Sequence, residues 1–380
     1  MEALDALAGD RAGLWIVEDL HWAGGDVLAF LSFAGETAGR RLVLTTSRPS
    51  LLETAAAWCT NEAPFDLPSL PPSAASDLVR ALVGDALPAE LAARIADASD
   101  GNPLFIEELL RTWISVGALV EDDGAWILAR PGEDVTLPSS VQAIYAAQLD
   151  DLPRARDVAR RASVAGRRFP VEALGPLGVV DASDGVVLLA RRALVSGPAA
   201  DQVYGSSYAY RHALLRDAAY ASLSRADRAR LHVCLARWLE GLHGAGRAQV
   251  AEPIGRHYAR ALETVPLLAL EVAPELGRDD CRRRAALWLE RAAGEALEVA
   301  AHENARELLV RALELTGAAE VEERARRLVG LGEVTAATAD MAEGARILRE
   351  ALELARAGRD RRGIARAAAA LSWVLDQQVR

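Results

Sequence analysis

The sequence predicts a mainly α-helical protein that begins with a partial α/β part. A strand–helix–strand pattern fills the first 50 residues, and both of its apolar strands end in polar residues. A long middle stretch carries helix-start signals and few strand signals. In the last third, leucine and alanine recur at helical spacing in a repeated register. Helical segments and helical repeats therefore follow a small sheet.

The first strand is predicted at residues 14–17, "LWIV". Four consecutive apolar residues suit a strand of a parallel sheet that is covered on both faces. A helix is expected over 26–38, and "RRLVLTTSRP" (40–49) predicts a second buried strand. Ligands bind at the carboxyl ends of strands in such α/β units. The polar residues after each strand are therefore candidate ligand-binding groups.

The middle of the chain predicts three short helices and a hairpin. Ser73, Pro88 and Pro103 stand at helix starts. The expected helices cover about 74–83, 88–99 and 103–116. "LVEDDGAWIL" (119–128) predicts a hairpin that turns at Asp123-Gly124.

The next block follows the order helix, helix, helix and two-stranded wing, which is typical of a winged helix. It opens at "LPSSVQAIYAAQLDDLP" and runs through "RRALVSG" to "SSYAYRHALLRDAAYASL". "SRAD" (224–227) is expected to cap the following helix as an S-x-x-D box.

The last third is predicted to be purely helical and repetitive. "ELLVRALEL" (307–315) returns as "RILREALEL" (346–354), so that Leu309 and Leu348 lie 39 residues apart. Small residues at repeated positions of helix pairs indicate a TPR-like solenoid, although its usual period is about 34 residues. A plain helical bundle is the alternative.

Composition limits the possible functions. A length of 380 residues predicts about two to four domains. With 51% hydrophobic and 26% charged residues, the chain is expected to be globular. A net charge of −11 argues against a general nucleic-acid-coating role.

Cysteine usage and hydropathy indicate a cytoplasmic protein. The three cysteines show no C-x-x-C spacing, which favours a reducing compartment over a zinc site or a disulfide framework. The acidic first residues are unlike a signal peptide, and no apolar run reaches the length of about 20 residues that crosses a bilayer. No membrane partner is expected.

Glu18 and Asp19, which follow the first strand, are the first candidates for chemistry. A carboxylate at the carboxyl end of a buried strand can hold Mg²⁺ beside nucleotide phosphates. A second carboxylate can polarise an attacking water. The alternative is a strand that simply ends in a polar turn.

The surrounding residues add a resemblance to a known family. "EDLHWA" (18–23) resembles the Walker B segment of the STAND-type signalling ATPases, P-loop proteins found in LuxR-type regulators and in cyclase-linked or kinase-linked ATPases. Gly24 replaces the final acid of that segment, and Asp26 stands two positions further on. The resemblance implies that Glu18 and Asp19 serve as catalytic residues and as Mg²⁺ ligands.

Two further segments resemble this family in the same order. "LVLTTSRP" resembles the sensor strand, which implies that Thr46 and Arg48 read the γ-phosphate. "SDGNPLFIEELLR" (99–111) resembles the G-x-P segment of the helical lid, which implies that Pro103 lies against the adenine. The alternative for that segment is an ordinary helix start with Asn102 as its N-cap.

"YRHALLRDAAY" (210–220) is the most specific downstream match. It resembles the winged-helix segment in which relatives read Met-His-Asp, with Ala213 in place of the aspartate. The resemblance implies that His212 contacts the β-phosphate of ADP. The alternative is a capping or packing histidine. The matches together cover about residues 12–240.

The resemblance also implies a domain organisation. A truncated P-loop ATPase sheet half, the partial NTPase core, is expected at 1–70 and a helical lid at 71–135. A winged-helix domain is expected at 136–243 and TPR-like helical repeats at 244–380.

A phosphate-binding loop cannot be found in this sequence. The Walker A loop, G-x-x-x-x-G-K-[ST], needs a lysine, and all 43 basic residues are arginine. We expect the chain to be the carboxyl-terminal part of a longer ATPase; a degenerate module that no longer hydrolyses ATP is the alternative. ATP or ADP with Mg²⁺ is expected only together with an upstream segment. By itself the chain is expected to be inactive, which leaves open whether it is an enzyme.

Three functions follow from these patterns. The first is a nucleotide-dependent switch that couples a helical-repeat sensor to an effector outside this chain, in signal transduction or transcriptional regulation. The second is a non-enzymatic helical-repeat scaffold that binds a protein partner. The third is a winged-helix DNA-binding regulator. Expected partners are an adenine nucleotide and, through the repeats, a protein or small ligand. DNA contact is not expected, and the effector, whether HTH, cyclase or kinase, is left open.

Overall fold

The structure is a computed structural model with two compact units. It describes residues 12–36, 41–48, 51, 65–84, 87–115, 117–122, 125–129, 140–180, 182–201, 204–244, 250–265, 271–338 and 340–379. The first unit combines 1–65, 249–259 and 279–380. The second combines 66–248 and 260–278. Each unit is described separately.

The first unit contains the predicted strand–helix–strand element. Strands β1 (Gly13–Val17) and β2 (Arg41–Thr45) pair in parallel, with Leu14 opposite Leu42 and Ile16 opposite Leu44. The short helix η1 (Leu20–Trp22) and helix α2 (Gly25–Glu36) lie between them in sequence. Because parallel strands need a crossover connection, α2 takes that role. The predicted order of elements is confirmed.

Helix α2 covers one face of this strand pair. The ring of Trp15 stacks on Phe30 of α2 at a centroid distance of 6.2 Å. The opposite face carries four aliphatic side chains that are more than half exposed: Leu14 (59%), Ile16 (58%), Leu42 (63%) and Leu44 (52%). The prediction that both strands are covered on both faces is therefore wrong for the described residues, since a single crossover helix covers only one face.

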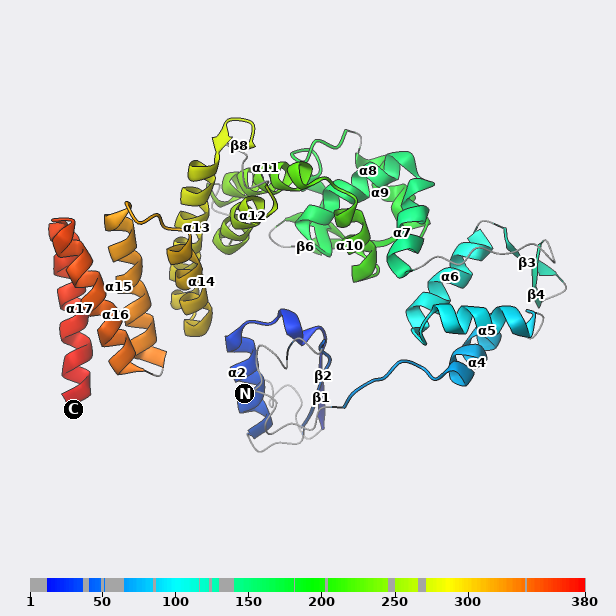
Figure 1. The fold of residues 1–380 in the computed structure, drawn as a ribbon, viewed down its shortest axis with the longest axis horizontal. Coiled ribbons are helices and arrows are strands. Elements are labelled where there is room, and N and C mark those ends of the chain that lie inside the picture. Colours follow the sequence, from blue (N-terminus) through cyan, green and yellow to red (C-terminus); the bar gives the residue numbers. More distant parts are fainter. Residues whose placement is uncertain are drawn as a thin grey trace. The chain divides into compact units, whose positions relative to one another are not determined.

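The helical repeats make up most of the rest of this unit. They comprise α12 (Ala251–Thr264, of which residues up to 259 belong here), α13 (Arg278–Glu298), α14 (His302–Glu314), α15 (Val321–Thr338), α16 (Met341–Ala357) and α17 (Arg361–Val379). Consecutive helices from α14 to α17 pack against each other, and α15, α16 and α17 lie side by side (Figure 1). The mainly helical fold class is confirmed.

The repeated sequence register corresponds to alternate helices. "ELLVRALEL" lies in and just after α14, and "RILREALEL" lies in α16. The matched residues Leu309 and Leu348 are both buried, as are Ala312 and Ala351. Each copy therefore presents the same face to its neighbours, as expected for stacked repeats.

Two glycines allow α15 and α16 to approach closely. A Cβ atom added at Gly332 would lie 2.7 Å from Leu348 Cγ, and one added at Gly344 would lie 2.6 Å from Ala336 Cβ. Real Cβ atoms do not tolerate such distances, so the small residues predicted at packing positions are sterically required here.

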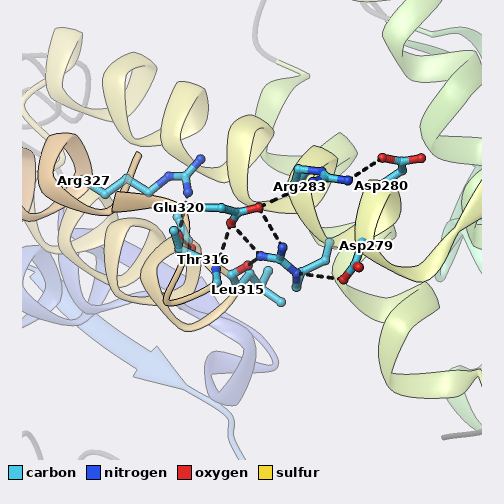
Figure 2. Close-up of polar contacts among 10 residues, drawn as sticks. Asp279, Asp280, Arg283, Leu315, Thr316, Glu320 and Arg327 are labelled. Atoms are coloured by element: carbon cyan, nitrogen blue, oxygen red, sulfur yellow. Dashed lines mark hydrogen bonds and ion pairs between the residues drawn. The ribbon is translucent and has the colours of Figure 1, made fainter. Parts of the chain in front are cut away.

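An arginine–glutamate pair fixes the turn between α14 and α15 to α13. Arg282 of α13 donates two hydrogen bonds to the carboxylate of Glu320, at 2.7 and 2.8 Å. The Gly317 amide donates a third at 2.8 Å, and Arg282 also donates to the carbonyl oxygen of Leu315. Figure 2 shows Glu320 at the centre of these contacts. The guanidinium of Arg282 lowers the pKa of Glu320 to about 2.

The second unit begins with the predicted three helices and hairpin. Helices α4 (Pro72–Val83), α5 (Ala89–Ala98) and α6 (Pro103–Ser115) lie within two residues of their predicted bounds. Strands β3 (Leu119–Asp122) and β4 (Ala125–Leu128) pair in antiparallel fashion. The predicted turn residues, 123 and 124, lie outside the described residues.

The next block contains more sheet than the sequence predicted. Its elements are α7 (Val141–Asp150), α8 (Pro153–Ala162), η3 (Ser163–Ala165), β5 (Arg168–Pro170), η4 (Val171–Ala173), α9 (Ala182–Arg191), β6 (Val195–Asp201), β7 (Gly205–Tyr210), α10 (Ala213–Ala221) and α11 (Arg225–Gly244). The strands form an antiparallel sheet in the order β5–β7–β6, so β5 adds a strand to the expected two-stranded wing. The predicted cap before α11 is confirmed, because the Asp227 amide donates to Ser224 Oγ at 3.0 Å.

A short hairpin interrupts the region that was predicted to be purely helical. Strands β8 (Glu271–Ala273) and β9 (Leu276–Gly277) pair in antiparallel fashion around a turn at Pro274 and Glu275. The prediction is wrong at this point because proline has no amide donor for a helix, and Glu275 has a positive φ of 61°.

A single hydrophobic cluster runs through this unit from Ala75 of α4 to Ala219 of α10. Its largest fully buried side chains include Tyr145, Phe169 and Tyr210. The predicted domain boundary between residues 135 and 136 lies outside the described residues. On both sides of it, the described helices contribute to the same core.

The turn before α6 depends on a glycine. Gly101 has a φ of +67°, and a Cβ atom there would lie 2.1 Å from the carbonyl oxygen of Leu70. The Leu70 amide in turn donates to the Gly101 carbonyl at 2.9 Å. The segment before α4 is thereby hydrogen-bonded to the turn before α6.

We predict that Gly101→Ala destabilises the second unit more than Gly84→Ala does. Gly84 also has a positive φ, +80°, but a Cβ atom there would meet nothing within 4 Å. Backbone strain alone costs about 1–3 kcal/mol, whereas Gly101→Ala adds a clash with backbone atoms. Hydrogen exchange of the α4–α6 amides measures the loss of stability in each variant. An equal loss in both variants would contradict this account.

We also predict a pH-dependent contribution of Glu320 to stability. Its pKa in the folded chain lies below the ordinary value of 4.5, so its contribution is complete above about pH 4.5 and is lost as pH falls towards 2. Glu320→Gln should therefore cost about 1.5–3 kcal/mol at neutral pH, as is typical of hydrogen bonds to a charged group. Near pH 2 it should cost almost nothing.

Urea denaturation across this pH range gives the comparison. Glu343→Gln is the matched control, because Glu343 also pairs with an arginine, Arg346, but on an exposed helix surface. Such pairs contribute little to stability. A cost of Glu320→Gln that is independent of pH would show that the charge of Glu320 is not what stabilises the turn.

Candidate functional site

The four predicted site residues that follow β1 and β2 meet at one edge of the strand pair. Glu18 and Asp19 follow β1, and Thr46 and Arg48 follow β2. The Asp19 amide donates to Thr46 Oγ1 at 3.2 Å, and the Leu20 amide donates to the Thr46 carbonyl at 2.8 Å. The structure therefore brings these four predicted site residues into one small region.

Asp19 has a left-handed backbone conformation at this edge. Its φ of 57° and ψ of 39° are unusual for a residue other than glycine, although aspartate tolerates them better than most residues do. The hydrogen bond to Thr46 accompanies this conformation. Glu18, Asp19, Thr46 and Arg48 are all exposed there, so their side chains are accessible to a ligand.

The donor set at this edge suits a hydrated magnesium ion. Mg²⁺ is usually held through one or two carboxylates together with water and substrate phosphates. Glu18 and Asp19 offer two carboxylates. No larger cluster of His, Cys, Asp or Glu side chains that could hold a metal ion occurs in the described part of the chain.

His21 is a residue of this edge that the site prediction missed. The Arg48 amide donates to His21 Nδ1 at 3.3 Å, which adds a third hydrogen bond to the two already described between these loops. Since Nδ1 accepts this bond, it carries no proton in this arrangement. The histidine within "EDLHWA" was the available sequence signal.

Asp26, the acid just beyond the same segment, caps a repeat helix of its own unit. Its carboxylate accepts from the Asn304 amide at 2.9 Å and from the Glu303 amide at 3.3 Å. Both amides belong to the first turn of α14, where backbone donors lack helical partners. Asp26 therefore connects α2 directly to the helical repeats.

Pro103 and His212 lie in the second unit, around helix α6. Pro103 is exposed at the first position of α6, and Asn102 Oδ1 accepts from the Leu104 amide at 3.0 Å. This is the capped helix start that was the alternative for the segment. The proposed role of Pro103 at an adenine stays a prediction.

His212 lies at the N-cap of α10 and contacts α6 and α7. Its Nε2 atom is 3.5 Å from Glu108 Oε1, and its ring stacks on Tyr145 at 6.2 Å. Burial lowers the pKa of His212, although Glu108 acts in the opposite direction. His212 and Glu108 both line a cavity of about 160 Å³.

A second cavity lies within the helical repeats. It measures about 300 Å³ and is lined by residues of α14, α15 and the turn between them, namely Val310, Leu313, Glu314, Thr316, Arg324 and Leu331. Its aliphatic walls and its two opposite charges suit a ligand or peptide side chain.

Among the helices that the structure describes, none is long and apolar enough to cross a membrane.

Comparisons with known proteins find similarities in sequence and in structure. A family described as "Domain of unknown function (DUF8739)" matches residues 71–124, from α4 to the β3–β4 hairpin. An uncharacterized protein of Rhizobium meliloti (strain 1021) is 29% identical over 251 residues, 61% of this chain and 23% of that protein. The chain thus spans about a quarter of the length of this curated relative.

Among solved structures, the chain is similar to a Signal Transduction ATPase with Numerous Domains (STAND) protein with a tetratricopeptide repeat sensor from Pyrococcus horikoshii. The TM-score is 0.42 and the sequence identity is 14%, over 98% of this chain and 54% of that chain.

We predict that the Thr46 hydroxyl holds the Asp19 turn. Thr46→Val removes the acceptor of the Asp19 amide, whereas Thr46→Ser keeps it. A typical hydrogen bond contributes about 0.5–1.5 kcal/mol, so amide exchange around Asp19 should be about two- to tenfold faster in Thr46→Val. Hydrogen exchange measured by mass spectrometry tests this, and equal exchange in the valine and serine variants would refute it.

Proposed function

We propose that this chain is part of a nucleotide-dependent signalling ATPase, a switch that couples helical repeats to an effector outside the chain. The observation that carries the proposal is the meeting of Glu18 and Asp19 with Thr46 and Arg48 at the carboxyl edge of a parallel strand pair. Ligands of α/β folds bind at this edge.

Each residue of the edge has a role in this proposal. Glu18 and Asp19 would hold Mg²⁺, directly or through water, and one of them would polarise the attacking water. The Thr46 hydroxyl and the Arg48 guanidinium would contact the γ-phosphate. A magnesium ion held by Glu18 and Asp19 would supply charge neutralisation for the nucleotide phosphates.

The exposed aliphatic face of the strand pair supports a larger α/β domain. Leu14, Ile16, Leu42 and Leu44 form a continuous face through their paired register. Parallel sheets are usually covered on both faces, and exposed apolar patches mark interaction surfaces. We propose that further polypeptide of a longer ATPase covers this face and supplies the phosphate loop that needs a lysine.

The contact between Asp26 and α14 supports coupling to the repeats. It attaches α2, the helix after the magnesium-binding turn, to the first turn of a repeat helix. Rearrangement of the α2 start on nucleotide binding would therefore act directly on α14. In the same proposal, Pro103 contacts adenine and His212 contacts the β-phosphate of ADP.

The remaining parts are assigned by the same proposal. The order α7–α8–α9 followed by the β6–β7 ribbon supports a winged-helix domain between the lid and the repeats. DNA contact is not part of its proposed role. The protein is proposed to act in the cytoplasm.

A second candidate function is a non-enzymatic scaffold that binds a protein through its repeats. The cavity of about 300 Å³ between α14 and α15 favours it. In that case Glu18 and Asp19 would have only a structural role at the end of β1.

We predict that the 380-residue chain alone hydrolyses no ATP, because it has no lysine to contact the β- and γ-phosphates. The longer protein with its upstream segment should bind and hydrolyse ATP. Asp19→Asn in that protein should suppress hydrolysis by about 10²-fold or more, with a smaller effect on binding. Phosphate release and binding of a fluorescent ATP analogue measure the two effects.

Two results would contradict the proposal. One is micromolar ATP affinity of the short chain that Asp19→Asn abolishes. The other is an upstream sequence without a phosphate loop, which would favour the scaffold. Asp26→Asn serves as a comparison in the longer protein, because Asp26 caps α14 and is not proposed as a metal ligand.

A further inference from the structure

The cavity beside His212 has the construction of a small-ligand site. It lies between α6, α7, the turn after α9 and the start of α10, all within the second unit. Buried leucines, Leu152, Leu194 and Leu215, supply aliphatic walls. Ligand sites commonly combine such walls with a few polar groups that converge on the ligand. A volume of about 160 Å³ limits the occupant to a small molecule.

Two buried polar atoms of residues that line this cavity have no hydrogen-bond partner among the described residues. They are the hydroxyl oxygen of Tyr145, a fully buried residue, and Oε1 of Gln148. Buried polar atoms are paired in most folds, and each exception calls for an explanation. Burial raises the pKa of Tyr145, so its hydroxyl keeps its proton and can donate.

The hydrogen bonds around Thr112 fix the orientation of the Gln148 amide. Thr112 Oγ1 donates its proton to the carbonyl oxygen of Glu108 at 2.7 Å. The contact at 2.8 Å from Gln148 to Thr112 Oγ1 must then use the NH₂ group of Gln148. Oε1 is therefore an acceptor. Two residues that line the cavity thus carry an unpaired donor, at Tyr145, and an unpaired acceptor, at Gln148, among the described residues.

The charges around the cavity balance each other. Two acids, Glu108 and Asp151, and two arginines, Arg111 and Arg192, are among its lining residues. Arg111 already donates to Glu108 Oε1 at 2.8 Å. Such a balance disfavours a polyanion such as a nucleotide phosphate chain. It favours a molecule that carries one positive and one negative group.

We propose that this cavity binds a small zwitterion with an aliphatic body, of the class of the aliphatic amino acids. The ammonium group donates to Gln148 Oε1 and to the carboxylate of Glu108. The carboxylate accepts from the Tyr145 hydroxyl and from Arg192. The side chain packs on Leu152, Leu194 and Leu215. None of the cavity's residues belongs to β1 or β2, but the cavity shares His212 with the proposed ADP contact. Binding of the zwitterion and contact of His212 with the β-phosphate of ADP are therefore alternative states of this residue.

Calorimetric titration of the 380-residue chain with L-leucine tests the proposal. L-leucine should bind with a saturable heat at millimolar concentrations or below. Leucinamide lacks the carboxylate and N-acetyl-leucine lacks the ammonium group, so each should bind at least about tenfold more weakly. Inorganic phosphate should not displace L-leucine.

Two variants locate the site. Tyr145→Phe and Gln148→Ala should each weaken L-leucine binding about five- to tenfold. Tyr145→Phe removes a hydroxyl that has no hydrogen-bond partner in the part of the chain that the structure describes, so the melting temperature of the free chain should not fall. Gln142→Ala, an exposed change on the same helix, is the matched control and should bind L-leucine normally.

Three results would overturn the proposal. The first is no heat with L-leucine in the folded chain. The second is binding that neither Tyr145→Phe nor Gln148→Ala weakens. The third is displacement of L-leucine by inorganic phosphate, which would assign the cavity to an anion. Because L-leucine binding needs no phosphate loop, its failure would leave the proposed ATPase function unaffected.

Discussion

The parallel pairing of β1 with β2 is the constraint on which the candidate nucleotide edge depends. A crossover connection joins two parallel strands, so both strands point the same way and their carboxyl ends lie at the same edge of the sheet. Asp19 and Thr46 are 27 residues apart in sequence, yet pairing makes them hydrogen-bonded neighbours. The left-handed turn at Asp19 is compatible with this edge because Thr46 accepts the Asp19 amide. A slip in strand register would separate the acids from Thr46 and Arg48.

Contacts within the first unit continue from this edge into the repeats. Asp26 caps α14, and the turn at the other end of α14 is fixed to α13 by the pair of Arg282 and Glu320. A displacement of α2 would therefore act on the first turn of α14, a helix whose other end is held to α13. Coupling between distant sites needs packed and hydrogen-bonded contacts of this kind. These contacts are the physical basis of the coupling that we propose between the strand edge and the repeats.

The sequence predicted the long elements well because their periodicity is repeated many times. Helices α4–α6 and the register shared by α14 and α16 follow from apolar spacing and helix starts. Strands β5, β8 and β9 were missed, since strands of two or three residues carry almost no periodic signal. An apolar run such as "LWIV" also cannot show whether one face or both are covered. The roles of His21 and Asp26 depend on partners far along the chain, which local patterns do not contain.

Glu108 shows what packing alone leaves unexplained. In "FIEELLR", Glu107 is exposed, whereas Glu108 lies on the apolar face with Phe105, Ile106 and Leu109. Burial of a carboxylate is costly, and apolar residues of similar size often replace buried ion pairs without loss of stability. Here the carboxylate pairs with Arg111 at 2.8 Å. It also lies 3.5 Å from His212 and lines the cavity of the second unit. This position supports the small ligand that we propose for the cavity.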